Sequence, residues 1–80
     1  MSEFTNDFFV EYELIKDSSI TKFKCYDWKL NYSGEIIICY CIDLESNLQR
    51  LYFDLSCYDK FVIRRSDNII VFSHYGGKYL

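Results

Sequence analysis

The 80-residue sequence contains no alanine and no proline, and it has only three glycines. Alanine is the best helix former, so its absence argues against long helices. Sixteen positions are instead Phe, Tyr or Trp, and aromatic residues prefer the pleated, half-buried surface of a sheet. The composition therefore predicts an all-β protein with at most one short helical turn.

A strong excess of charge is also missing. Twelve acidic and nine basic side chains leave a formal net charge of -3. This balance is too even for a disordered chain, and its sign does not favour general nucleic-acid binding. The longest apolar block, residues 36–42, is too short to cross a membrane, and the acidic start of the chain differs from a secretory signal. We therefore expect a cytoplasmic protein with no membrane partner.

Histidine is nearly absent, which restricts metal binding and acid–base catalysis. The single histidine, His74, lies near the end of the chain, with no carboxylate placed to orient it. The four cysteines lack the paired C-x2-C spacing of structural zinc sites; they are Cys25, Cys39, Cys41 and Cys57. We expect four free thiols that act as small apolar core residues. We also expect no metal, no cofactor and no enzymatic activity.

Alternation of apolar and polar residues predicts short strands. Residues 8–15 alternate with a period of two, and Glu11 and Glu13 mark the solvated face of a strand. A helix that starts near residue 6 would also accommodate some of these apolar residues. Residues 21–32 alternate too, but the pattern changes phase near Cys25, which a β-bulge would explain.

Turn residues place the remaining strands in hairpins. Ser33 and Gly34 close the first, with Leu30 opposite Ile37 and Trp28 opposite Cys39. Residues 36–42 are apolar on both faces, as in a central strand covered on both sides. A turn at residues 46–47 would pair Asp43 with Arg50, and a turn at residues 66–67 would pair Phe61 with Phe72. Ser56 would cap a loop or single helical turn before the last hairpin.

These strands predict a five- or six-stranded antiparallel meander curled into a small barrel or sandwich, because a flat sheet this apolar would expose its second face. We expect one β domain over residues 1–80, with flexible termini at 1–6 and 75–80. The expected core consists of Trp28, Leu30, Ile37, Cys39, Cys41, Ile63, Ile70 and Phe72.

The second face of the central hairpin mixes apolar and charged side chains. Tyr40 offers a large amphipathic ring, and the carboxylates of Asp27 and Asp43 border it. With Lys29 on the same face, these residues form the predicted partner-binding site. A further layer of strands over this face is the alternative interpretation.

This face predicts a non-enzymatic protein-interaction module that binds a larger protein. The abundance of Phe, Tyr, Ile, Asn and Lys is typical of AT-rich genes. It suits a phage or mobile-element accessory protein that inhibits a host protein, as anti-CRISPR proteins do. The alternative is a small β-barrel that binds single-stranded nucleic acid by stacking bases on exposed rings. The cations available for that role are Lys22, Lys24, Lys29, Arg64 and Arg65. The oligomeric state stays open.

Overall fold

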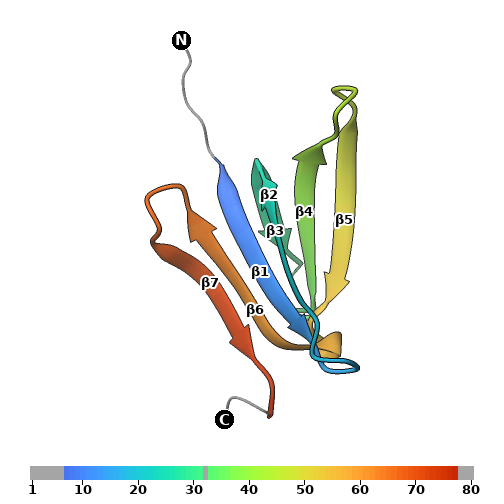
Figure 1. Ribbon diagram of the computed structural model, residues 1–80, viewed down its shortest axis with the longest axis vertical. Coiled ribbons are helices and arrows are strands. Elements are labelled where there is room, and N and C mark those ends of the chain that lie inside the picture. The colour runs from blue at the N-terminus through green and yellow to red at the C-terminus, as the bar shows by residue number, and fades with distance from the viewer. Residues whose placement is uncertain (1–6, 32, 78–80) are drawn as a thin grey trace.

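The computed structural model describes residues 7–31 and 33–77, which form two antiparallel sheets (Figure 1). One sheet has four strands in the order β2-β1-β6-β7, and the other has three in the order β3-β4-β5. The all-β prediction is confirmed as two separate sheets that do not close into a barrel, and the helical interpretation of residues 8–15 is wrong. The elements are β1 (Phe8–Leu14), β2 (Ile20–Cys25), β3 (Asp27–Leu30), β4 (Ile36–Ile42), β5 (Leu48–Asp54), the 3-10 turn η1 (Leu55–Cys57), β6 (Tyr58–Arg65) and β7 (Ile70–Tyr75).

The change of phase near Cys25 marks the place where the chain passes from one sheet to the other. β2 ends at Cys25, Tyr26 forms a bend, and β3 begins at Asp27. The amide of Tyr26 donates a 2.9 Å hydrogen bond to the carbonyl oxygen of Tyr40, so the pairing with β4 starts at the bend. The segment predicted as one bulged strand therefore forms two strands, which gives seven strands rather than five or six.

Aromatic rings occupy the space between the two sheets. Phe61 of β6 is fully buried, and its ring centroid lies 5.2 Å from that of Phe53 in β5 and 5.9 Å from that of Tyr12 in β1. These rings join strands that are far apart in the sequence, so their contacts hold the two sheets together. The core cluster consists of Val10, Cys25, Ile37, Cys39, Phe53, Leu55, Phe61 and Ile63.

The predicted core is confirmed in part. Ile37, Cys39 and Ile63 are buried, and three other predicted residues pack against the core from partly buried positions: Trp28, Cys41 and Phe72. Leu30 and Ile70 are 39% and 48% exposed, so their prediction is wrong. Leu30 ends β3 and Ile70 begins β7, and the ends of strands receive less cover from a facing sheet.

The register of the first hairpin is confirmed. β3 pairs with β4 so that Leu30 lies opposite Ile37 and Trp28 opposite Cys39. Gly34 has a φ of 78°, the left-handed conformation that glycine adopts without steric cost. A short turn with this glycine fixes the register, and β4 is the central strand of its sheet as predicted.

The register between β4 and β5 differs from the prediction because the turn is longer. The amide of Asp43 donates to the carbonyl of Asn47 at 3.0 Å, and Ser46 has a φ of 65°. As a result Arg50 lies opposite Tyr40, and the predicted pair of Asp43 with Arg50 is wrong.

The register of the last hairpin also differs from the prediction, in this case by two residues. Phe61 lies opposite His74 rather than Phe72, and the turn includes Asn68 with a φ of 71°. A shift of two residues keeps residues 72–75 on their predicted side of the sheet. A further shift at Val71 places Ile70 opposite Arg64 and not on the face of Ile63, so the predicted face is wrong for Ile70.

The predicted start of the 3-10 turn and the predicted flexible tail also differ from the structure. Asp54 rather than Ser56 caps η1, and its Oδ1 accepts a 3.0 Å hydrogen bond from the amide of Ser56. At the other end, Tyr75 belongs to β7 and the amide of Gly76 donates to the carbonyl of Asp59 at 2.7 Å. The prediction of a tail that starts at residue 75 is wrong for these two residues. Gly77 is the last described residue, and the other residues of the predicted flexible termini, 1–6 and 78–80, lie outside the described residues.

Candidate functional site

The face of the three-stranded sheet that points away from the core is the first candidate site. The register of β3, β4 and β5 aligns Asp27, Tyr40 and Arg50 in one row across this face. The next row consists of Lys29, Ile38 and Tyr52. Directly opposed residues of an antiparallel sheet share one side. We call these six residues the outer face.

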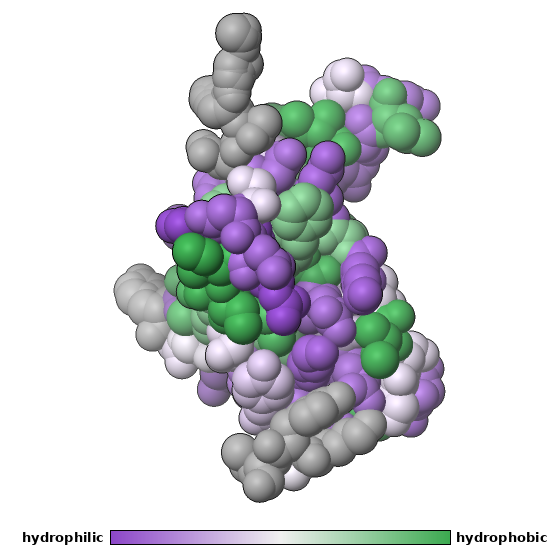
Figure 2. Space-filling model, turned by 60° about the vertical axis from the view of Figure 1, so that its left-hand side comes forward, coloured by the Kyte–Doolittle hydropathy of each residue, from purple (hydrophilic) through white to green (hydrophobic). Residues whose placement is uncertain are grey.

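Solvent reaches the outer face. Tyr52 is 62% exposed, and the apolar surface continues along the hairpin to Ile42 and Leu48, which are 57% and 71% exposed. The tip of this hairpin stands clear of the rest of the molecule and carries hydrophobic as well as polar side chains (Figure 2). The prediction that β4 is covered on both sides is therefore wrong, because its second face is only partly buried.

Tyr40 lies between two shallow hollows. The first has a volume of about 480 Å³ and is lined by β3 residues, Tyr26 and Tyr40. The second has a volume of about 510 Å³ and lies over β5, with Arg50 and Tyr52 in its lining. The rings of Tyr26 and Tyr40 are tilted against each other with centroids 6.4 Å apart, and both rings line both hollows. A molecule on this face would contact Tyr40 from either side.

The structure brings together three of the four predicted partner-binding residues. Asp27, Lys29 and Tyr40 lie on the outer face, and Asp27 also accepts a 2.9 Å hydrogen bond from the amide of Trp28. Sequence reasoning missed Arg50 because the predicted turn placed it opposite the wrong residue. The alternation along residues 48–54 places Arg50 and Tyr52 on one side of β5. Only the correct register shows that this side is the one that carries Tyr40.

Asp43 belongs to the turn between β4 and β5. Its Oδ1 accepts hydrogen bonds from the amides of Glu45 and Asn47, both at 2.9 Å. Its Oδ2 accepts a 2.9 Å bond from the side-chain amide of Gln49. The bond from Asn47 and the bond from Gln49 lower the pKa of the Asp43 carboxyl, so the ionised form shapes this turn.

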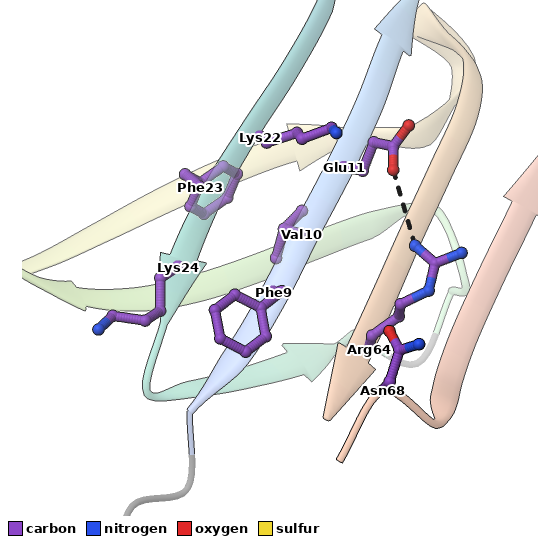
Figure 3. A pocket seen from close by; sticks show the side chains of 8 residues that line it. All are labelled: Phe9, Val10, Glu11, Lys22, Phe23, Lys24, Arg64 and Asn68. Carbon is purple, nitrogen blue, oxygen red and sulfur yellow. Dashed lines mark ion pairs between the residues drawn. The ribbon is translucent and has the colours of Figure 1, made fainter. Parts of the chain in front are cut away.

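A second candidate site lies on the four-stranded sheet. A pocket of about 420 Å³ is lined by β1, β2 and β6, and the side chains of Phe9, Lys22, Lys24 and Arg64 gather there (Figure 3). Phe9 is 46% exposed. An exposed ring beside cations is the arrangement expected for stacking on nucleic-acid bases.

The carboxylate of Glu11 neutralises part of this positive charge. It accepts a 2.9 Å hydrogen bond from the Lys60 ammonium and lies 3.6 Å from the Arg64 guanidinium. The hydrogen bond from Lys60 and the nearby cations lower the pKa of Glu11. Lys24 is 3.8 Å from Asp7. The pocket therefore combines paired charges rather than a free cationic surface.

The remaining cations named for nucleic-acid binding lie elsewhere. Lys29 belongs to the other sheet, and Arg65 pairs with Asp67 at 2.6 Å. Glu13, predicted to be solvated, is only 3% exposed. β1 is an interior strand flanked by β2 and β6, so neighbouring side chains on both sides cover this position.

All four cysteines are free, but their environments differ. Cys25 and Cys39 are buried, whereas Cys57 is exposed, so the prediction of a core position is wrong for Cys57. The contact with Cys25 and burial both raise the pKa of the Cys39 thiol, and burial raises that of Cys41. In residues 7–31 and 33–77, no group of three or more His, Cys, Asp or Glu side chains is placed to hold a metal ion.

Comparisons with protein-family models, with curated proteins and with solved structures give no match to this chain. Within the described part of the chain, no helix is long and apolar enough to cross a membrane. Evidence on function therefore comes from the chemistry of the two surfaces.

Proposed function

We propose that the protein is a non-enzymatic, cytoplasmic interaction module that binds a larger protein through the outer face. The observation that carries the proposal is the composition of this face, which has an apolar and aromatic centre and a rim with charges of both signs. Protein interfaces are enriched in Tyr and Arg and have a polar rim. The rim charges would set the orientation of the partner.

Tyr40 is the proposed anchor of this interface. The ring is half-buried, and hollows on both sides of it offer space for side chains of the partner. A side chain already restrained by its neighbours loses little conformational freedom on binding. Central, well-packed tyrosines are frequent hot spots of protein interfaces.

A more specific version of the proposal is that binding inhibits a host protein, with the chain acting as an accessory product of a phage or mobile element. The support is the small size of the protein and its AT-rich type of composition. A domain of 80 residues would inhibit its target by binding to part of the target's surface and covering it.

The test is affinity capture from the native host with nuclease treatment, quantified by mass spectrometry for wild type and Tyr40→Ala. We expect one stoichiometric protein that survives nuclease and is lost with Tyr40→Ala. Loss of a hot spot weakens affinity about 30-fold or more. Tyr52→Ala removes a more exposed ring and tests the same face at a smaller cost in stability.

The matched control is Phe9→Ala, which removes an exposed ring from the other sheet. This variant should capture the partner as wild type does. Folding of each variant is checked by its urea unfolding curve. A folded Tyr40→Ala that captures the partner at the wild-type level would refute the assignment of this face.

The alternative function is binding of single-stranded nucleic acid in the pocket beside Phe9. The exposed ring among Lys22, Lys24 and Arg64 favours it, and the ion pairs of Glu11 weaken it. We expect labelled homopolymer oligonucleotides to remain unbound at moderate salt. Binding that falls steeply with salt and disappears with Phe9→Ala would replace the protein-interaction proposal by this one.

A further inference from the structure

Within the described residues the two sheets have four edge strands, and three of them carry features that discourage pairing with another chain. β2 bears Lys22 and Lys24, and β3 is only four residues long. β7 is interrupted at Val71, where its register with β6 shifts. These devices are common protections of exposed sheet edges.

The edge of β5 is long and regular, and its two charged residues, Arg50 and Asp54, have opposite signs. β5 pairs with β4 along seven residues without a shift in register, and its sequence contains no lysine, glycine or proline. Six of its seven residues are exposed; the exception is Phe53. In Figure 1, β5 forms the outer side of the three-stranded sheet. Of the four edges, this one is best suited to receive another strand.

The hydrogen bonds of the β4–β5 ladder show which backbone groups face the free edge. Two hydrogen bonds mark the ends of the ladder. The amide of Asp43 donates to the carbonyl of Asn47 at 3.0 Å, and the amide of Leu55 donates to the carbonyl of Glu35 at 2.9 Å. Hydrogen-bonded pairs alternate with non-bonded pairs in an antiparallel ladder. The backbone groups directed to the free edge therefore belong to Leu48, Arg50, Tyr52 and Asp54.

We infer that β5 pairs antiparallel with β5 of a second copy of this chain, about a two-fold axis at Leu51. Arg50 then lies opposite Tyr52 of the second copy, and Asp54 of the second copy is its diagonal neighbour. The guanidinium reaches both the ring and the carboxylate. An axis between two residues would set outward backbone groups against inward ones, and an axis at Arg50 would oppose two like charges. An axis at Tyr52 would oppose Arg50 to Asp54 but leave Leu48 without a partner in β5. The axis at Leu51 is favoured because it pairs all four outward-facing residues and still brings Arg50 next to Asp54 of the second copy.

This pairing covers apolar surface and extends the sheet. Leu51, which is 37% exposed, meets its own copy at the axis. The two three-stranded sheets become one six-stranded sheet, and both outer faces lie on the same side of it. The inference goes beyond the proposed function and does not depend on it, because the purified protein alone is sufficient for the test.

The first test is sedimentation velocity of the purified protein over a concentration series. Wild type should shift from monomer to dimer as concentration rises. Arg50→Pro removes an amide that faces the free edge, so it should stay monomeric while keeping its bonds to β4. Arg50→Thr is the matched control, because it loses the same guanidinium but keeps the amide; it should dimerise more weakly than wild type and clearly more strongly than Arg50→Pro. A wild type that stays monomeric throughout, or an Arg50→Pro variant that dimerises like wild type, would overturn the inference.

The second test is disulfide cross-linking, which needs no proline and decides the question when Arg50→Pro does not fold. Leu51→Cys is combined with Cys57→Ser to remove the exposed native thiol. A non-bonded antiparallel pair brings the two Cα atoms to about 4.5 Å, within disulfide range. Mild oxidation should give a covalent dimer. Thr21→Cys on the β2 edge, in the same Cys57→Ser background, should remain monomeric. Equal cross-linking at both positions, or none at residue 51, would contradict pairing through β5.

Discussion

Replacement of Phe61 by alanine tests whether the aromatic cluster between the sheets holds the fold together. Phe61 is fully buried, and its ring lies 5.2 Å from Phe53, 5.5 Å from Tyr58 and 5.9 Å from Tyr12. These contacts connect β6 with two other strands, β1 of its own sheet and β5 of the facing sheet. Truncation therefore removes the buried ring and leaves a cavity where the two sheets meet.

We expect Phe61→Ala to lower the free energy of unfolding by about 4–5 kcal/mol, the upper part of the usual range for a buried phenylalanine. Several ring contacts are lost together, and each adds about 0.5–1.5 kcal/mol beyond the buried area, which is why the upper part applies. A domain of 80 residues has about 4–12 kcal/mol in total. The variant should thus lose from about a third of this stability to all of it.

The assay is urea unfolding followed by the emission of Trp28, the single tryptophan. The control is Phe9→Ala, because Phe9 is 46% exposed and its loss should cost less than about 1 kcal/mol. Phe61→Leu retains most of the volume and should cost about 1–1.5 kcal/mol, which keeps the test measurable if the alanine variant does not fold. An unfolding free energy for Phe61→Ala within about 1 kcal/mol of wild type would refute the role of the cluster.

Three further predictions concern other parts of the molecule. Gly76→Ala should destabilise the protein by about 1–3 kcal/mol in thermal or urea unfolding, because its Cβ would lie 2.8 Å from Oδ1 and 3.1 Å from the Cα of Asp59. Gly77→Ala should have little effect, since nothing lies within 4 Å of its Cβ, and equal losses would contradict this reading. In the native protein an aromatic disulfide reagent should modify Cys57 first, and Cys57→Ser should remove that fast phase; a fast phase that persists would mean that a core thiol is accessible. The lowered pKa of Glu11 means that its ionised form stabilises the fold above the unfolded pKa of about 4.3, and that this contribution is lost as pH falls through the folded value. The stability difference between wild type and Glu11→Gln should therefore shrink from about pH 7 to about pH 3 in urea unfolding, and a difference independent of pH would argue against the ion pairs.

Local patterns were sufficient to predict the strands. The alternation at residues 8–15 identified β1, and the continuous apolar block at residues 36–42 identified β4. The short turn at Gly34 also gave the correct register between β3 and β4, because a tight turn leaves few ways to pair its flanking strands. Longer turns allow several pairings of their flanking strands, and both predicted registers that depended on longer turns were wrong.

The candidate site was predictable only in part. Asp27, Lys29 and Tyr40 share one face as a consequence of the local hairpin register. Arg50 and Tyr52 joined them through β5, whose pairing depended on the longer turn. Sequence alternation shows which side chains share a face, but it does not show whether another layer will cover that face.

The sequence by itself determined the all-β class, the position of most strands and, along β1, β3 and β4, the side of the strand on which the residues lie. These are local properties, set by side-chain shape, alternation and turn residues. Only the tertiary structure decided that the chain changes sheets at Tyr26, that β1 lies between β2 and β6, and that Glu13 is consequently buried. It also decided that the outer face and the edge of β5 remain accessible. Pairing between distant strands depends on competition among all the available edges and faces, and no single segment of the sequence encodes that competition.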